Sequence, residues 1–379
     1  MILDSSDWQE VTLGDICQFK YGKSLPAAER INGPFPVYGS NGRVGSHTSA
    51  LTRGPTIIVG RKGSLGEVNY SETACWPIDT TYYIDRTATD ADLRWLVHRL
   101  LGLELTQLNK AAAVPGLNRD DAYRKRLLLP PIDEQRRLAN LLDHANSLRI
   151  QRSGTLTLLE NFTQSVFVDM FVDGATPSWM VATVDELVDR NKGSIRTGPF
   201  GSQLLHSEFV NEGVAVLGID NAVSNEFRWS ERRYITEAKY KQLRRYTVYP
   251  GDVLITIMGT CGRAAVVPDD VPIAINTKHL CCITLDRSRC LPTYLHNYFL
   301  RHPVARSYLE KSAKGAIMSG LNMGIIRSLP VVLPPVAMQR EFEARRVVIQ
   351  GQREIHTAAR GELDELIAAL QQRAFAGRL

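Results

Sequence analysis

One ordered set of short motifs occurs twice in the chain, and this internal repeat constrains the fold more than any other feature of the sequence. The copies lie 204 residues apart (116 to 320). That spacing far exceeds the roughly 20–50 residues of a solenoid repeat, so it indicates a duplicated domain. The closest pairs are Gly-Leu-Asn at 116–118 and 320–322, Leu-Pro-Pro at 129–131 and 333–335, and Gln-Arg at 135–136 and 339–340.

Weaker matches follow the same order in both halves. Gly63-Ser64-Leu65-Gly66 pairs with Gly259-Thr260-Cys261-Gly262, and each of these runs follows an apolar, partly β-branched segment. Near the helix ends, Gln164 and Phe167 pair with Gln372 and Phe375, now 208 residues apart. The drift from 204 to 208 amounts to a four-residue stutter in the second helical part.

Each copy contains a globular part followed by a long helical part. Residues 1–130 and 179–333 are rich in glycine turns and short β-branched runs, which predict small irregular sheets. Residues 131–178 and 334–379 place apolar side chains at heptad-like spacing, which predicts coiled-coil helices. The predicted fold class is α+β, with two similar globular domains and two spacer helices bounded as above.

Arg152 and His356 occupy seam positions near the midpoints of these helices, close to Gly154 and Gly361. One interpretation is a solvent-exposed, slightly loosened helix centre. The other is a polar device that sets the register where two antiparallel helices cross.

Motifs of the common catalytic sites are missing from the sequence. There is no GxGxxG, GxxxxGK[ST], GxSxG or HExxH run. Ile132 and Val336 follow the two Leu-Pro-Pro runs, so neither run forms the Asn/Asp-Pro-Pro-Tyr/Phe signature of an amino-methyltransferase. Since the six cysteines form no CxxC pair, we expect reduced thiols and no metal site. Since the catalytic motifs are missing, we expect no catalysis by this chain.

No apolar run approaches the ~18–20 residues that cross a bilayer. The acidic, polar N-terminus is unlike a signal peptide. We therefore expect a soluble, cytoplasmic protein without a membrane partner.

The net charge of +5 is unevenly distributed. The globular parts together carry +6 and the helical parts −1. Basic side chains on loops rich in glycine, amides and hydroxyls favour nucleic acid as a partner. Any one such loop, taken alone, is as readily an ordinary polar surface loop.

This plan resembles the specificity subunit of Type I restriction-modification enzymes over essentially the whole chain. In each half the resemblance rests on an opening Trp (Trp8, Trp179), the Gly-Ser-Leu-Gly or Gly-Thr-Cys-Gly turn, and Gly-Leu-Asn. It rests further on Leu-Pro-Pro with Gln-Arg opening a long helix that closes in Gln-Ser-Val-Phe or Gln-Arg-Ala-Phe. The run Thr197–Ser202 is similar to one often seen in these domains. Each motif is weak alone, whereas the ordered double set is specific.

The resemblance implies two target-recognition domains separated by two long antiparallel helices, each domain reading one half of a bipartite, asymmetric double-stranded DNA target. It implies that the helices dock two modification subunits, which bind S-adenosylmethionine and methylate adenine N6. Restriction subunits would add ATP- and Mg-dependent translocation and cleavage, with no cofactor on this chain. About 38 helical residues give a rod of roughly 57 Å, enough to reach major-groove faces about one turn (roughly 34–36 Å) apart.

Guided by the resemblance, we select candidate site residues on the polar loops and on the helices. The candidate DNA contacts are Tyr38, Ser40, Asn41, Arg43, Arg61, Lys62, Ser64, Lys110, Arg196, Thr197, Ser202, Thr260, Arg263, Lys278 and Lys314. The candidate partner-docking residues are Gln135, Leu138, Leu148, Leu159, Phe167, Gln339, Phe342, Leu363, Leu366 and Phe375.

Two other functions remain open at this point. The chain could be a stand-alone DNA-binding or targeting protein that is not coupled to a methyltransferase, or an adaptor that binds protein only. Co-purification with an adenine methyltransferase separates the first from the specificity subunit. Salt-dependent DNA binding excludes the second, because phosphate contacts weaken steeply as salt rises.

Overall fold

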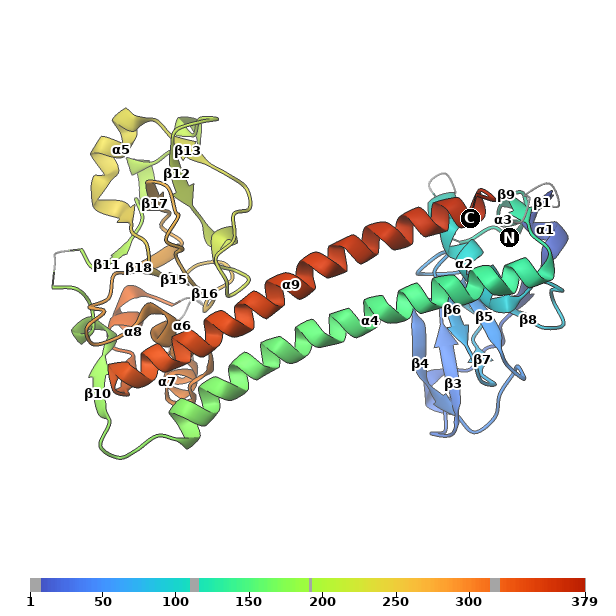
Figure 1. Ribbon diagram of the computed structural model, residues 1–379, viewed down its shortest axis with the longest axis horizontal. Helices are drawn as coiled ribbons and strands as arrows, with labels where there is room; N and C mark the ends of the chain where they lie inside the picture. Colours follow the sequence, from blue (N-terminus) through green and yellow to red (C-terminus); the bar gives the residue numbers. More distant parts are fainter. Residues whose placement is uncertain (1–7, 110–115, 191–192, 314–320, 379) are drawn as a thin grey trace. The chain divides into compact units, whose positions relative to one another are not determined.

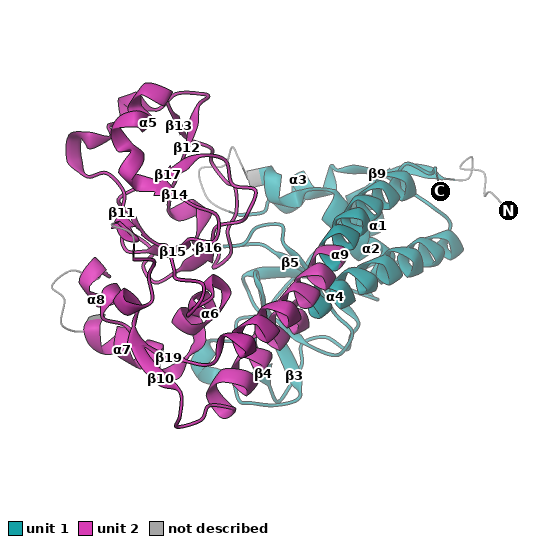
Figure 2. Cartoon of the chain, turned by 60° about the vertical axis from the view of Figure 1, so that its left-hand side comes forward, with its two compact units in different colours: residues 1–155, 356–379 teal, residues 156–355 magenta. Residues whose placement is uncertain are grey.

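The computed structural model describes residues 8–109, 116–190, 193–313 and 321–378. The chain forms two compact units, one of residues 1–155 with 356–379 and the other of residues 156–355 (Figure 2). Both long helices, α4 (Ile132–Val168) and α9 (Val336–Phe375), contribute a segment to each unit (Figure 1). The N- and C-terminal ends of the chain therefore belong to the same unit.

The first unit contains three small sheets. An antiparallel sheet has the order β2-β8-β5-β6, a mixed sheet has the order β4-β3-β7, and β1 pairs with β9. The strands are β1 (Gln9–Thr12), β2 (Lys20–Tyr21), β3 (Phe35–Gly39), β4 (Gly42–His47), β5 (Thr56–Gly60), β6 (Val68–Ser71), β7 (Trp76–Pro77), β8 (Thr81–Asp85) and β9 (Arg126–Leu129). The short helices are α1 (Leu13–Ile16), α2 (Leu93–Gly102) and α3 (Arg119–Tyr123).

The second unit repeats this plan. Its sheets have the orders β11-β18-β15-β16 and β13-β12-β17-β14, and β10 pairs with β19. The strands are β10 (Met180–Thr183), β11 (Ile195–Thr197), β12 (Val214–Leu217), β13 (Tyr234–Ile235), β14 (Thr247–Val248), β15 (Val253–Thr256), β16 (Ala264–Val266), β17 (Ala274–Asn276), β18 (Leu280–Ile283) and β19 (Pro330–Leu333). The helices are α5 (Glu237–Leu243), α6 (Pro292–Arg301), α7 (Pro303–Ala313) and α8 (Met323–Arg327).

Equivalent strands confirm the repeat in detail. In both units a parallel pair, β3 with β7 or β12 with β17, lies beside a central antiparallel hairpin, β5–β6 or β15–β16. Both glycines of each hairpin turn adopt a positive φ, between +71° and +80°, which only glycine adopts readily. The predicted α+β class, the duplicated domain and the long helices are confirmed.

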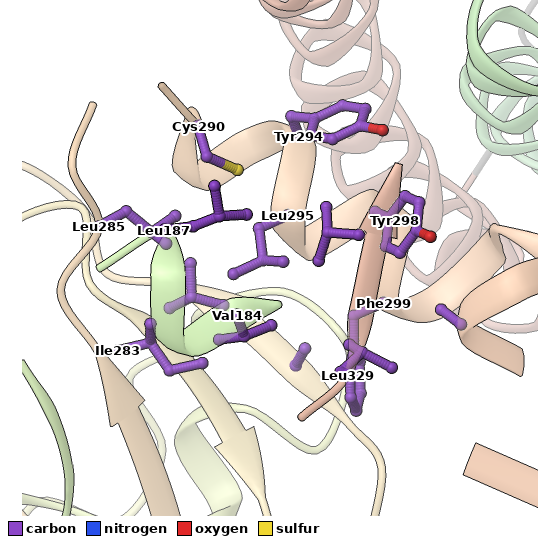
Figure 3. Packing of buried hydrophobic residues seen from close by; sticks show 14 of the residues in the cluster. Val184, Leu187, Ile283, Leu285, Cys290, Tyr294, Leu295, Tyr298, Phe299 and Leu329 are labelled. Carbon is purple, nitrogen blue, oxygen red and sulfur yellow. The ribbon is translucent and has the colours of Figure 1, made fainter. Parts of the chain in front are cut away.

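Aromatic and aliphatic side chains of α6 form the centre of the second unit's core. Tyr294, Tyr298 and Phe299 are buried and belong to one cluster with strand and loop residues such as Ile283 and Leu329 (Figure 3). The ring centroids of Phe167, near the end of α4, and Phe342, near the start of α9, lie 5.5 Å apart. Both residues belong to this same core. In the first unit, Leu138 and Ala139 of early α4 share a core with Ala374 of late α9. The helices therefore run antiparallel within each unit, and their ends are core elements.

A buried glutamine fixes the start of each long helix to its own domain. The Gln135 Oε1 accepts the backbone N–H of Asp92 at 2.8 Å, and its Nε2 donates to the Pro130 carbonyl at 2.8 Å. The Gln339 side chain repeats both bonds, with the Leu291 N–H at 2.8 Å and the Pro334 carbonyl at 3.0 Å. We call these two residues the clamp glutamines. Each one satisfies backbone groups at a short domain helix and at the Pro-Pro helix start, groups that burial would otherwise leave unpaired.

Gln339→Leu is expected to lower the free energy of unfolding of the second unit by about 2–4 kcal/mol, because it leaves a buried N–H and carbonyl unpaired. In thermal unfolding this corresponds to a decrease in Tm of roughly 5–10 °C. Gln352→Leu, an exposed position on the same helix, is the matched control and should change the free energy by less than about 0.5 kcal/mol. Equal changes in the free energy of unfolding for the two substitutions would show that the Gln339 hydrogen bonds do not stabilise the second unit.

Candidate DNA interface and helix pair

Seven candidate DNA contacts of the first unit lie on, or directly beside, two turns that touch each other. Ser40 and Asn41 form the turn between β3 and β4, and Arg61, Lys62 and Ser64 lie in the glycine turn after β5. A Cβ added to Gly63 would lie 3.3 Å from the Ser40 Oγ, so the turns are in contact. Tyr38 and Arg43, on the strands flanking the first turn, complete the group.

Backbone hydrogen bonds to the segment before β8 hold these turns in place. The N–H groups of Arg61 and Lys62 donate to the Thr80 carbonyl at 2.9 and 3.1 Å. The Ile78 N–H donates to the Tyr38 carbonyl at 2.9 Å. The structure therefore gathers residues that are up to 26 positions apart (38 to 64) at one edge of this unit.

Sequence reasoning missed two members of this surface, Tyr21 and Arg119. The guanidinium carbons of Arg61 and Arg119 lie 5.3 and 5.7 Å from the centre of the Tyr21 ring, which is 54% exposed. The Arg61 Nη2 donates to the Asp79 carbonyl at 2.7 Å. We call Tyr21, Arg61 and Arg119 the basic–aromatic cluster. Two guanidinium groups around an exposed ring suit DNA, because arginine binds phosphate oxygens and guanine edges.

Four candidates of the second unit lie on segments joined by hydrogen bonds. The N–H of Gly198, next to Thr197, donates to the Thr277 carbonyl at 3.2 Å, next to Lys278. The hairpin turn that carries Thr260 and Arg263 is tied to the same segment, because the Ile257 N–H donates to the His279 carbonyl at 2.9 Å. Burial, with Lys278 and Arg233 nearby, lowers the pKa of His279. Ser202 is exposed on a separate turn (Gly201–Gln203), and Lys110 and Lys314 lie outside the described residues.

Arg196 is the exception, because its side chain lies inside the domain. Its Nη2 donates to Asp252 at 2.5 Å and to the Thr247 carbonyl at 2.6 Å, and its Nη1 donates to the Thr284 hydroxyl at 2.9 Å. The residue is only 8% exposed. A guanidinium with its donors directed at buried partners is a structural ion pair, so the structure speaks against Arg196 as a DNA contact.

Half of the candidate docking residues require a correction of the same kind. Gln135, Leu138, Phe167, Gln339 and Phe342 are all at most 4% exposed. They hold the helix ends on their own domains and present no surface to a partner. Leu148 and Leu366 are exposed, whereas Leu159, Leu363 and Phe375 are partly buried.

Five apolar residues of the long helices in the second unit are each more than half exposed: Leu158, Phe162, Val347, Val348 and Ile355. The heptad spacing includes Phe162, which was therefore expected in the seam and is exposed instead. The other four lie outside the heptad positions, so the spacing did not select them. Apolar faces of this kind mark protein-binding surfaces.

The polar seam residues contact each other across the helix pair. The Arg152 Nη1 donates to the His356 Nδ1 at 2.8 Å. These residues are equivalent in the repeat, 204 positions apart. The contact favours the register device over a loosened helix centre, because a one-turn slip would separate the pair.

The duplicated domain, its polar turns and the exposed helix residues are the features to compare with known proteins. Residues 5–160 match the family model described as "Type I restriction modification DNA specificity domain". Two curated relatives are specificity subunits of Type I restriction enzymes. The EcoBI subunit of Escherichia coli is 23% identical over 240 residues, which is 58% of this chain and 50% of that protein. The MjaVIII subunit of Methanocaldococcus jannaschii is 19% identical over 279 residues, which is 66% of this chain and 64% of that protein.

Solved structures show the same fold. The S subunit of a Type I restriction-modification system from M. genitalium matches with a TM-score of 0.64 at 13% identity, covering 99% of this chain and 98% of that one. A chain from a study of complex assembly and conformational transition of the type I R-M system matches with a TM-score of 0.58 at 16% identity, covering 99% of both. The resemblance found in the sequence is confirmed, since the family model, both curated relatives and the first of these structures are those of Type I specificity proteins. It spans half the length of the EcoBI subunit. No helix among the described residues is long and apolar enough to cross a membrane.

Proposed function

We propose that the chain is the DNA sequence-specificity subunit of a Type I restriction-modification complex in the cytoplasm. One observation carries the proposal: a domain matching a DNA specificity model in residues 5–160 is followed by a second unit with equivalent sheets, one of them extended by the extra strand β14. Two similar recognition domains in one chain suit a bipartite target, and differences between their turns make that target asymmetric. The chain itself is a recognition component, not a catalyst.

The turns that carry the candidate DNA contacts act as the reading surfaces. In the first unit this surface combines the turns at Ser40 and Arg61 with the basic–aromatic cluster. In the second unit the equivalent hairpin turn carries Thr260 and Arg263 beside Lys278. Arginine contacts with guanine edges, together with phosphate contacts, provide specificity and affinity respectively.

The exposed apolar helix residues act as docking surfaces for two modification subunits, which carry S-adenosylmethionine and methylate adenine N6. Restriction subunits with ATP and Mg complete the complex. Five large apolar side chains exposed on the two long helices favour a partnered subunit over a stand-alone DNA-binding protein, because a partner would remove their surface from water.

Arg61→Gln and Arg119→Gln are each expected to weaken binding of the target duplex by about 10- to 100-fold, because each removes a positive donor from the basic–aromatic cluster. The measurement is a fluorescence anisotropy titration of a duplex carrying the site methylated in cells that express the complex. Arg124→Gln is the control. It removes the same charge from the residue directly after α3, an arginine that is already paired with Asp121 at 2.8 Å. Binding that is equal in all three variants would exclude the cluster from the interface.

Val347→Asp combined with Val348→Asp is expected to reduce the number of bound modification subunits without unfolding the chain, since both side chains are exposed. Removal of residues 335–379 is a poorer test, because it deletes Gln339, Phe342 and Ala374 from the two cores. Mass photometry of the reconstituted complex gives the stoichiometry. Val181→Asp, an equally exposed valine outside the long helices, is the control. A double variant that still binds two subunits would place docking elsewhere.

A further inference from the structure

A polar cavity of about 390 Å³ lies within the second unit, where the long helices meet α6 and α7. Late α4, early α9, the loop at 224–226 and the hairpin turn at 262–263 supply the rest of its walls. Its size lies within the range of small-molecule sites, roughly 300–1,000 Å³. We call this cavity the arginine pocket, because its walls carry Arg263, Arg301, Arg306, Arg346 and Arg353.

The acidic side chains in the wall do not balance these arginines. Only Glu160 and Glu226 line the cavity, which leaves three positive charges in excess. Glu226 is already shared, since it pairs with Arg353 and, at 3.5 Å, with Arg228. Arg306 makes only a loose pair with Glu310, at 3.7 Å.

Arg346 is the more buried of the two pocket arginines whose side chains make no hydrogen bond or ion pair within the described ranges, the other being the exposed Arg263. The Arg346 side chain is half-buried. Burial lowers the pKa of Arg346, and Arg353 lowers it further against the opposing effect of Glu226 and Glu343. Arg301 donates to the Asn297 Oδ1, and burial lowers its pKa. Glu160 and Glu226 raise the pKa of Arg301, whereas Arg346 and Arg353 lower it. These arginines therefore lie close enough to repel one another in a partly desolvated wall.

A bound anion offsets such repulsion. Several guanidinium groups converging on one polar cavity are the arrangement that recognises phosphate, because each presents paired N–H donors to its oxygens. Of the two carboxylates in the wall, Glu226 is already bound by Arg353, so Glu160 alone is left to oppose the other four arginines.

We propose that the arginine pocket binds a phosphate group, with Arg346 as its principal ligand and Arg301 beside it. The phosphate belongs either to a free phosphorylated molecule of nucleotide size or to the DNA backbone. The same chemistry serves both sources, and the inference stands independently of which DNA sequence the recognition domains read.

Two adjacent arginines provide the test. Arg346→Gln removes the proposed ligand, whereas Arg345→Gln removes an exposed arginine that pairs with Glu341 at 2.6 Å, outside the pocket. Isothermal titration of the full chain with pyrophosphate should give binding to the wild type and to R345Q, and binding at least about tenfold weaker to R346Q. The Tm of R346Q without ligand should stay within about 2 °C of that of the wild type, because no hydrogen bond is lost.

A second arm identifies the source of the phosphate. The affinity for a random-sequence duplex is measured against salt for all three proteins. The measured quantity is the slope of the logarithm of affinity against the logarithm of salt concentration. If R346Q, but not R345Q, reduces the magnitude of this slope by about one, the pocket binds a phosphate of the DNA backbone. An unchanged slope together with weakened pyrophosphate binding supports a free phosphorylated ligand, and this result stands even if DNA recognition fails.

Two outcomes overturn the proposal. The first is that R346Q binds pyrophosphate and duplex as the wild type does. The second is that the wild type binds neither probe, while R346Q loses a modification subunit. That result would assign the pocket to an acidic side chain of the partner.

Discussion

The clamp glutamines are the interaction on which the rest of the structure depends. Each long helix begins beside its own domain, and Gln135 or Gln339 ties that start to the backbone before a short domain helix. Both glutamines are buried, so lengthening or breaking their hydrogen bonds would leave polar groups unpaired away from water. These bonds therefore fix the direction in which each helix leaves its domain. The same two bonds in both units give two reading surfaces, each with a helix in the same relation to its own domain.

The helix ends serve the cores, which leaves the remaining helix surface for partners. Phe167 and Phe342 complete one core, and Leu138 with Ala374 completes the other. Between these ends, Arg152 and His356 keep the two helices in register. Under the proposed function, exposed residues such as Val348 can therefore change with the partner at little cost to the fold.

The repeat, the fold class and the hairpin turns were predictable from sequence, because they depend on local patterns such as positive-φ glycines and heptad spacing. The contacts that assign roles were not. The motif identifies Gln135, but its partner Asp92 lies 43 residues away in the sequence. The sequence therefore does not reveal that Gln135 binds its own domain and does not dock a partner. Arg196 was taken for a DNA contact because nothing in its local sequence reveals Asp252, 56 residues on. Tyr21 and Arg119 escaped notice for the same reason, since only the fold brings them together.

The central claim is that two copies of one domain-plus-helix unit read two halves of a DNA target. Sequencing N6-methyladenine across the genome of cells that express this chain with its methyltransferase partner tests it most directly. We expect methylation at an asymmetric site in two parts, separated by a spacer of fixed length whose sequence is not read. Methylation at a continuous site, or methylation that does not change when this chain is removed, would contradict it.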